Sequence, residues 1–410
     1  MHFPRGMHEM NYGRDVGGLA PDSLIFLQRF HSGEANMSDI PIRPEVRAFE
    51  PYTAGLSIDE IREKYHLDRV VKMASNENPL GVSPVVRRVI AERAGLAFRY
   101  PQAGNPKLSA ALGARHGVSA DRIVAGNGSD EIIDLLFRVC ATPGVHNAVA
   151  FRPCFGLYPT QSALCGVELR RADLNPDMSF PWERLLSLVD ASTALVFVTT
   201  PDNPSGRAAS RQELADLAAR LPASCLLVID EAYMDFTDDP HACSLLSDMR
   251  DGAPLADRVA VLRTFSKLFG LAGLRLGYGI LPPDIADYMR RVRLPFSVNL
   301  LAEEAALAAL GDETFRAKTL EVTRAGRAML GRELAALGCR VYPSQSNFIM
   351  FEPPEAVDSA RLFEDLLRRG FILRPLGGYG LPRHLRVSVG TAEENEGLVA
   401  ALGELLRSAA

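Results

Sequence analysis

The chain has 410 residues, of which 47% are hydrophobic and 23% are charged, and this composition excludes a disordered or low-complexity protein. Its 45 basic and 50 acidic residues give a net charge of −5 without a block of like charge, which argues weakly against nucleic-acid binding. The length is about 2.7 times that of an average domain and predicts one large domain with a smaller one.

The N-terminal residues carry no recognisable export signal. Their apolar run at 24–27 is too short for a secretory signal peptide, and Met37 offers an alternative translation start. We therefore expect residues 1–45 to form an irregular N-terminal extension.

The six cysteines are dispersed and form no C-x-x-C pair. This usage favours thiols in a reducing cytoplasm over disulfides, and no metal site is expected. The longest apolar runs are far shorter than the roughly 18 residues that span a bilayer, so we expect no membrane helix.

From about residue 120, short apolar runs alternate with amphipathic helical patterns. This alternation is typical of a large, mainly parallel sheet with helices on both faces. Helices are expected at 129–140 and 211–221, where apolar residues recur along one face. The expected strands are 122–125, 148–151, 194–199, 225–230, 259–263 and 276–280.

After residue 295 the pattern changes to long helices and hairpin-like strands, which indicates a smaller α+β domain. The sequence thus predicts an α/β protein with an extension at 1–45, a segment at 46–78, a large domain at 79–295 and a small C-terminal domain at 296–410. The expected elements of the small domain are helices at 300–310, 315–337 and 359–369 and strands at 340–342, 348–351 and 385–389.

The segment TFSKLFGLAGLRLGYG (264–279) places Lys267 directly after an expected strand and beside Phe265, Leu268 and Phe269. An ammonium group among apolar side chains loses hydration, so its pKa falls and the neutral amine becomes nucleophilic. Such a lysine suits Schiff-base chemistry. The alternative is a surface lysine whose aliphatic stem packs along apolar residues.

An acidic residue ends the apolar strand in CLLVIDEAY (225–233). Asp230 stands at the carboxyl end, where α/β sheets place their ligands, and it could keep a pyridine nitrogen protonated. A helix cap or turn residue is the alternative for Asp230. Tyr233 belongs either to the core or to a ligand site.

Two further strand ends carry polar residues. In ALVFVTTPDNPSG (194–206), Asn203 lies between two prolines, which hold its amide rigidly, although turn chemistry alone explains the prolines and the glycine. In AGNGSDEIIDLLFRVC (125–140), Ser129 and Asp130 begin a helix whose free amides suit a phosphate group. A simple capped helix is the alternative for the second motif.

These four elements, in this order, resemble the fold type I pyridoxal-phosphate enzymes and, within them, the class I/II aminotransferases. The resemblance covers about residue 45 to the C-terminus. More narrowly, the chain is similar to the histidinol-phosphate aminotransferases in five motifs, which are SNENPLG (75–81), RYPQAGNPKL (99–108), GNGSDEIIDLL (126–136), YPSQSNFIMF (342–351) and LRVSVGT (385–391). The resemblance implies that residues 46–78 pack on the small domain and the active site.

By this resemblance, the cofactor is pyridoxal 5′-phosphate and the catalytic residues are Lys267, Asp230 and Tyr233. Lys267 is expected to form a Schiff base with C4′ of the cofactor. Asp230 is expected to pair with the protonated pyridine nitrogen, while Tyr233 and Asn203 hydrogen-bond O3′.

The same resemblance places the cofactor phosphate on Ser129, Asp130, Ser266 and Arg275. The guanidinium group of Arg275 presents a bidentate fork that suits an anion.

Two aromatic residues complete the expected cofactor site. Phe155 stands where the family usually stacks a tyrosine on the pyridine ring, so stacking is kept and a hydroxyl contact is lost. Tyr100 matches the tyrosine that reaches the phosphate in the neighbouring subunit, so the resemblance implies a homodimer. A core aromatic and a surface turn are the respective alternatives.

For the substrate, Arg386 matches the anion-binding arginine of the family, and Arg374 is its expected partner. Two arginines suit the phosphate of one substrate and the carboxylate of the other. Tyr52 and Asn76 match positions that cover the substrate pocket, and Glu77 is a weaker candidate.

The reaction implied is transfer of the amino group of L-histidinol phosphate to 2-oxoglutarate, a step of histidine biosynthesis. An aromatic amino acid aminotransferase, a threonine-phosphate decarboxylase and, remotely, a non-catalytic regulator remain alternatives. The expected partners are small molecules and a second copy of the chain, with no nucleic acid and no membrane. His116 and His384 are expected at the surface, without a role.

Overall fold

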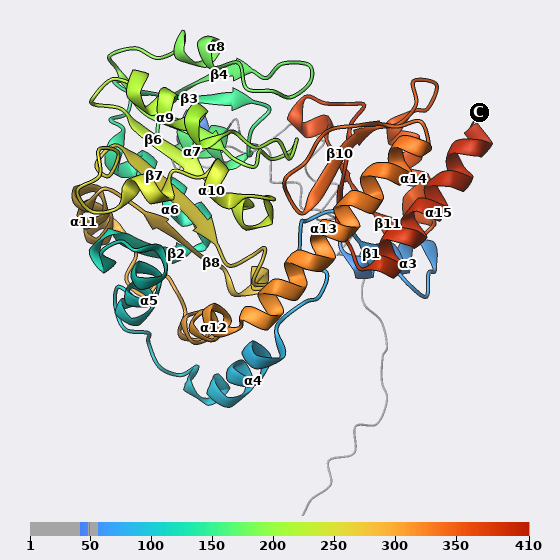
Figure 1. Ribbon diagram of the computed structural model, residues 1–410, viewed down its shortest axis with the longest axis horizontal. Coiled ribbons are helices and arrows are strands. Elements are labelled where there is room, and N and C mark those ends of the chain that lie inside the picture. Colours follow the sequence, from blue (N-terminus) through green and yellow to red (C-terminus); the bar gives the residue numbers. More distant parts are fainter. Residues whose placement is uncertain (1–41, 48, 50–55, 410) are drawn as a thin grey trace, which may run out of the picture. The chain divides into compact units, whose positions relative to one another are not determined.

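The computed structural model describes residues 42–47, 49 and 56–409 (Figure 1). The proposed start at Met37 lies outside the described residues, as does the expected irregular extension up to residue 41. Residues 42 and 43 have no regular structure, and helix α2 (Pro44–Arg47) follows them. Residues 56–409 belong to one compact unit, so the predicted boundary near residue 296 stays a prediction.

A seven-stranded sheet has the strand order β2-β8-β7-β6-β5-β3-β4. Strand β8 runs antiparallel to both of its neighbours, and the other adjacent strands are parallel. The strands are β2 (Ile123–Asn127), β3 (Asn147–Arg152), β4 (Glu168–Asp173), β5 (Thr193–Thr199), β6 (Leu226–Asp230), β7 (Val259–Thr264) and β8 (Leu276–Ile280). All six predicted strands are present, each within two residues of its expected ends.

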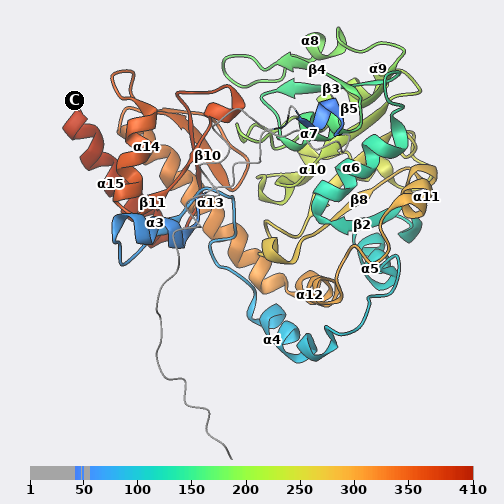
Figure 2. The same cartoon turned by 180° about the vertical axis from the view of Figure 1, so that it is seen from behind.

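Helices cover both faces of this sheet, as the sequence predicts. Along β5, Val196 and Val198 pack with residues of α5, α9 and α12, whereas Leu195 and Phe197 pack with α6, α7 and α11. Figure 2 shows α6 against the sheet from behind. The helices are α4 (Pro84–Arg93), α5 (Pro106–His116), α6 (Gly128–Cys140), α7 (Leu157–Leu164), α8 (Trp182–Leu186), α9 (Arg211–Arg220), α10 (Pro240–Cys243), α11 (Pro283–Val292) and α12 (Leu300–Gly311).

The C-terminal part contains a four-stranded antiparallel sheet with the order β12-β13-β10-β9. Its strands are β9 (Arg340–Val341), β10 (Phe348–Glu352), β12 (Arg374–Pro375) and β13 (Leu385–Ser388). Residues of α13 (Glu313–Ala336), α14 (Ser359–Arg368) and α15 (Ala392–Ala409) share one apolar cluster with β10 and β13. This arrangement agrees with the α+β pattern predicted for the region.

The segment after residue 55 joins this C-terminal part. Helix α3 (Ile58–Tyr65) packs Ile61 against residues of the C-terminal part, and β1 (Val71–Lys72) pairs in parallel with β11 (Phe371–Ile372). Short 3₁₀ turns complete the described chain: η2 (Ala94–Leu96), η3 (Ala120–Arg122), η4 (Met234–Phe236), η5 (Leu246–Met249), η6 (Ala272–Leu274) and η7 (Gly377–Tyr379).

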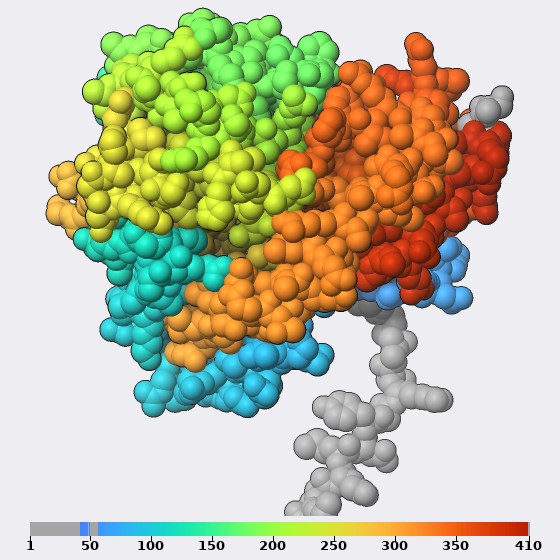
Figure 3. All heavy atoms as spheres, in the orientation of Figure 1, coloured from blue at the N-terminus to red at the C-terminus, as the bar shows by residue number. Residues whose placement is uncertain are grey.

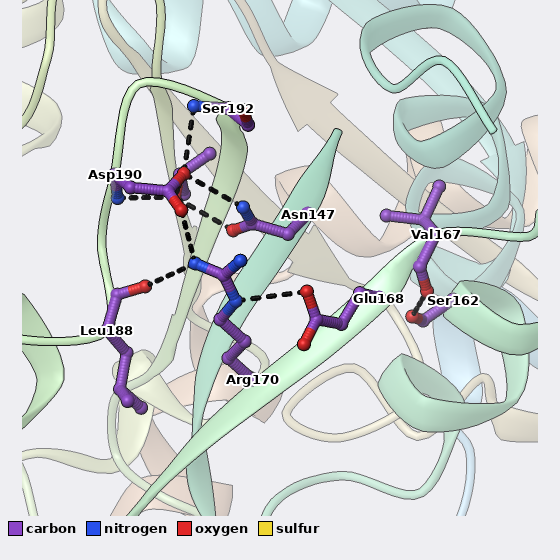
Figure 4. A network of polar contacts seen from close by, with 9 residues as sticks. Asn147, Ser162, Val167, Glu168, Arg170, Leu188, Asp190 and Ser192 are labelled. Carbon is purple, nitrogen blue, oxygen red and sulfur yellow. Dashed lines mark hydrogen bonds and ion pairs between the residues drawn. The ribbon is translucent and has the colours of Figure 1, made fainter. Parts of the chain in front are cut away.

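A polar network ties together the first residues of β3, β4 and β5 (Figure 4). Asp190 accepts hydrogen bonds from Asn147 Nδ2 at 3.0 Å, Ser192 N at 2.8 Å and Arg170 Nη1 at 2.6 Å. These donors, Arg170 first, lower the pKa of Asp190 to about 2. The network fixes the amino ends of the strands, which is the end of the sheet opposite to the polar strand ends described below.

Two histidines lie deeper than the sequence suggested. His116 is partly buried, and its Nε2 lies 2.8 Å from the hydroxyl of Tyr278, while burial lowers its pKa to about 3. The side chain of His384 is 11% exposed and contacts Tyr342 and Glu352. The expectation of surface positions was wrong because each imidazole has a buried phenol as a partner.

The cysteines are free thiols, of which Cys225 and Cys339 are buried and the other four partly buried. Within the described ranges, no helix has the length and apolar character needed to cross a membrane.

A buried ion pair links the ends of β6 and β7. Arg263 Nη2 lies 2.6 Å from Glu231 Oε2, and both side chains are at least nine-tenths buried. We predict that Arg263→Met lowers the free energy of unfolding by about 3–5 kcal/mol, because it leaves the Glu231 carboxylate buried without its counter-charge. Urea unfolding measures this change.

Arg220 provides the matched control, since it pairs with Glu183 at the surface. Arg220→Met is expected to leave the urea midpoint almost unchanged, because solvent screens exposed pairs. If both variants lost the same free energy of unfolding, the prediction that burial makes the loss of Arg263 more destabilising would be contradicted.

Candidate active site

A cavity of about 170 Å³ lies at the carboxyl ends of three adjacent parallel strands. Thr199 ends β5, Asp230 ends β6 and Thr264 ends β7, and all three line the cavity. Nine residues predicted from the sequence also line it, namely Ser129, Asp130, Phe155, Asn203, Asp230, Tyr233, Ser266, Lys267 and Arg275. The sheet therefore brings together side chains that are up to 146 positions apart, from Ser129 to Arg275.

Lys267 is partly buried on the cavity wall, between β7 and η6. Its Nζ donates a hydrogen bond to Ser75 O at 3.1 Å and lies 5.7 Å from the ring centroid of Tyr233. Burial, followed by the charge of Arg386, lowers the pKa of the amine to about 8. A substantial fraction of this amine is therefore neutral near pH 8, which a nucleophilic lysine requires.

Asp230 is a buried carboxylate with two donors. Its Oδ1 accepts from Ala232 N at 3.1 Å, and its Oδ2 accepts from the hydroxyl of Tyr158 at 3.0 Å. Burial raises the pKa of Asp230 to about 6, while these donors act in the opposite direction. The carboxylate is thus ionised at neutral pH and faces a small cavity.

Tyr158 and Thr199 were missed by the sequence analysis. The two hydroxyls lie 2.8 Å apart, and because the Tyr158 proton goes to Asp230, Thr199 donates to Tyr158. Tyr158 follows Phe155 by three residues, and the two rings meet edge to face with their centroids 5.9 Å apart. This spacing in RPCFGLYP was the available signal. Ala232 and Ala272 also line the cavity, and nothing in their sequence context marked them.

The opposite end of the cavity is built from the start of α6. Gly277 approaches this helix so closely that a Cβ there would lie 2.2 Å from Ser129 N. Gly128 adopts φ +78°, a conformation that side-chain-bearing residues rarely take. Arg275 Nη2 lies 3.1 Å from Asp130 Oδ2, so a guanidinium group and free helix amides meet at this end.

Strand β13 and the segment after β1 reach two lining residues. Arg386 Nη1 donates to Asn203 Oδ1, and its Nη2 donates to Ala74 O at 2.9 Å. Asn76 Nδ2 donates to the hydroxyl of Tyr233 at 3.0 Å and is itself held by Ser388. Arg386 and Asn76 therefore stand directly behind lining residues without lining the cavity themselves.

The remaining predicted residues occupy other surroundings. Arg374 is partly buried and stands opposite Arg386 in the register of β12 and β13. Glu77 Oε1 lies 3.2 Å from Lys72 Nζ. Tyr100 is 80% exposed and stacks on Phe296, away from the residues that line the cavity.

Tyr52 lies outside the described residues. No position or contact is therefore assigned to it.

Comparison with known proteins agrees with this geometry. Residues 68–402 match the family model described as aminotransferase class I and II. The chain is 62% identical over 365 residues to the histidinol-phosphate aminotransferase of Nitratidesulfovibrio vulgaris strain DP4, which covers 89% of this chain and 96% of the relative. It is 58% identical over 368 residues to that of Oleidesulfovibrio alaskensis, with 89% and 95% covered.

A solved structure shares the architecture. The histidinol-phosphate aminotransferase of Sinorhizobium meliloti, in complex with pyridoxal-5′-phosphate, superposes with a TM-score of 0.82 at 27% identity and covers 91% of this chain and 100% of that chain. The fold predicted from the sequence, a fold type I arrangement with a large mainly parallel sheet, is confirmed. The chain belongs to the class I and II aminotransferase family.

Proposed function

We propose that this chain is a pyridoxal-phosphate-dependent aminotransferase that converts L-histidinol phosphate and 2-oxoglutarate to imidazole acetol phosphate and L-glutamate in histidine biosynthesis. The observation that carries the proposal is a lysine amine of lowered pKa in one cavity with a buried carboxylate and an arginine. Relatives at 62% and 58% identity bear the name histidinol-phosphate aminotransferase, which favours this substrate over an aromatic amino acid or threonine phosphate.

The chemistry of the cavity fits the cofactor. It offers an amine for the aldehyde, a carboxylate for the pyridine nitrogen and an anion-binding end for the phosphate. When bound, pyridoxal 5′-phosphate supplies an electron-poor ring that stabilises negative charge at the α-carbon of the substrate.

Four side chains act on the ring and on the reacting atoms. Lys267 would hold the cofactor through Nζ, and the same amine would carry the proton of the substrate α-carbon. Asp230 keeps the pyridine nitrogen protonated through its negative charge. Tyr233 and Asn203 each retain one donor for O3′, since the phenol accepts from Asn76 and the Asn203 carbonyl accepts from Arg386.

The phosphate is held by the amides at Ser129 and Asp130, the hydroxyl of Ser266 and the guanidinium of Arg275. These groups combine the positive end of α6 with a formal positive charge. Phe155 lies on the cavity wall, where its ring would offer a stacking surface for the pyridine ring.

Substrate anions are bound by Arg386 and Arg374, which face each other across two paired strands. Burial lowers the pKa of Arg386, and its Nε has no hydrogen-bond partner within the described chain. The family resemblance adds Asn76 and Tyr52 to the residues of the substrate pocket. An anion that supplies the missing partner satisfies the buried guanidinium.

The functional unit is a homodimer. Phe98, Tyr100, Leu294 and Phe296 are large apolar side chains that are 77%, 80%, 72% and 41% exposed. Exposed apolar side chains that gather in this way mark an interface, and a second copy of the chain covers them. Tyr100 then extends into the site of the partner subunit.

The enzyme works in the cytoplasm on small soluble substrates. Its six cysteines are free thiols, as expected for a reducing compartment.

The function is tested by mixing the purified protein, pyridoxal 5′-phosphate, L-histidinol phosphate and 2-oxoglutarate and measuring glutamate. We expect glutamate from the wild type and none from Lys267→Ala, which removes the amine that holds the cofactor and moves the proton. Lys107→Ala, an exposed lysine on α5, is the control and should keep full activity. Carbon dioxide from threonine phosphate, without glutamate from histidinol phosphate, would contradict the proposal.

The pKa of Lys267 predicts how cofactor uptake depends on pH. The neutral amine attacks the aldehyde, so the rate at which cofactor-free protein takes up pyridoxal 5′-phosphate should rise with pH and level off above about 8. Stopped-flow absorbance of the bound cofactor measures this rate. A midpoint near 10.5, the value of an ordinary lysine, would contradict the lowered pKa.

Tyr158 donates a hydrogen bond to Asp230, and its removal gives a further prediction. Tyr158→Phe removes one hydrogen bond to the carboxylate, so the pKa of Asp230 rises further and turnover falls about tenfold. The acidic limb of the kcat profile should move to higher pH, which a purely structural change would not cause.

Thr199→Val is the matched control, because it leaves the Tyr158–Asp230 bond in place. It should produce a smaller shift in the same direction. An unchanged acidic limb in Tyr158→Phe would show that the phenol does not act on Asp230.

A further inference from the structure

A second hollow, of about 850 Å³, lies between the two sheet-bearing parts of the chain. We name it the arginine groove, after Arg207, which follows the turn after β5, and Arg324, Arg327 and Arg332, which all belong to α13. Asp238 is the one acidic residue among its described lining residues. Figure 3 shows the orange atoms of α13 beside the yellow-green atoms of the neighbouring part on this face.

Two of these arginines are engaged in holding the backbone. Arg327 donates to Phe236 O at 3.0 Å and to Ser346 O at 3.1 Å, and its Nη2 lies 2.6 Å from Asp238 Oδ1. Arg324 donates to Thr237 O at 3.0 Å. The carboxylate of Asp238 is thus already neutralised by Arg327.

The other two arginines do not hold the backbone. In the described chain, the side chains of Arg207 and Arg332 make no hydrogen bond and no ion pair. The carboxylates of Asp177 and Glu213 attract the charge of Arg207 only at longer range. Gln345 Nε2 donates to Asp238 at 3.0 Å, which further occupies the single acidic group. The residues that line the groove therefore carry an excess of positive charge.

We propose that the arginine groove binds a small phosphate-bearing molecule. Guanidinium groups bind phosphate oxygens through paired N–H donors, which makes arginine the preferred residue for such anions. Arg207 comes from the side of the large sheet and Arg332 from α13, and both line the groove in which the anion would lie. This binding is independent of the proposed reaction.

The groove lies behind residues of the candidate active site. The turn that leads to Arg207 also carries Asn203, and Gly206 O accepts from Gln345 N at 2.8 Å. The loop held by Arg324 and Arg327 follows Tyr233 by way of η4. A bound anion therefore stabilises two segments that line the cofactor cavity.

The test uses the protein loaded with pyridoxal 5′-phosphate, so that the cofactor phosphate site is filled, and inorganic pyrophosphate as the probe. Isothermal titration calorimetry compares the wild type with the double variant Arg207→Gln, Arg332→Gln. We expect the double variant to bind pyrophosphate at least about tenfold more weakly, because two charge-assisted contacts are lost. Neither side chain holds the fold, so the thermal midpoints should agree.

The control is the double variant Arg88→Gln, Arg361→Gln, which removes two exposed arginines of other helices. It should bind pyrophosphate like the wild type, and any binding at Arg386 remains equal in all three proteins. No binding to the wild type, or equal binding by all three, would overturn the site. Citrate bound as tightly as pyrophosphate would overturn the assignment to phosphate.

Discussion

The site depends on one buried negative charge, the carboxylate of Asp230, held at the end of a central strand. Burial alone favours protonation of this group, and the pKa of about 6 expresses that tendency. The backbone amide of Ala232 and the phenol of Tyr158 oppose it. In the proposed function, this charge, kept away from water, is what pairs with the pyridine nitrogen of the cofactor.

The parallel sheet explains how such distant residues meet. Strands β5, β6 and β7 run in one direction, so their carboxyl ends lie along one edge and the residues after them converge. This geometry follows from the alternation of apolar runs and helical patterns, which is why strands, helices and most of the cavity could be predicted. The polar motifs were recognisable because each one interrupts an apolar strand at its end.

The features that the sequence analysis missed were missed for physical reasons. Strand β4 carries a polar, half-exposed pattern at the sheet edge, so it lacks the apolar run by which the other strands were found. The hydrogen bonds of Tyr158 and His116 could not be foreseen from the sequence, because their partners lie on strands that are distant along the chain. The contacts of Arg386 with Asn203 and of Asn76 with Tyr233 join residues more than 150 positions apart, and only the fold brings them together.

The two sheet-bearing parts are joined on both sides of the active site. Arg386 and Asn76 contact the lining residues Asn203 and Tyr233, while Arg327 and Gln345 hold the loops on the other side. Movement of one part relative to the other would therefore shift the side chains of Asn203 and Tyr233 together. The arginine groove lies at this second junction, where a bound anion would add to the contacts already present.

The guanidinium of Arg386 has already left bulk water when the chain folds, and Asn203 and Ala74 take the places of its lost hydration. A cation in this position needs little further dehydration, so it attracts an anion more strongly than an arginine at an open surface does. An anion that accepts from the free Nε leaves the Asn203 contact in place, whereas an anion that accepts from Nη1 competes with the Asn203 carbonyl. In the proposed function, anion binding at Arg386 and the hydrogen bond to O3′ of the cofactor are thus linked through the side chain of Asn203.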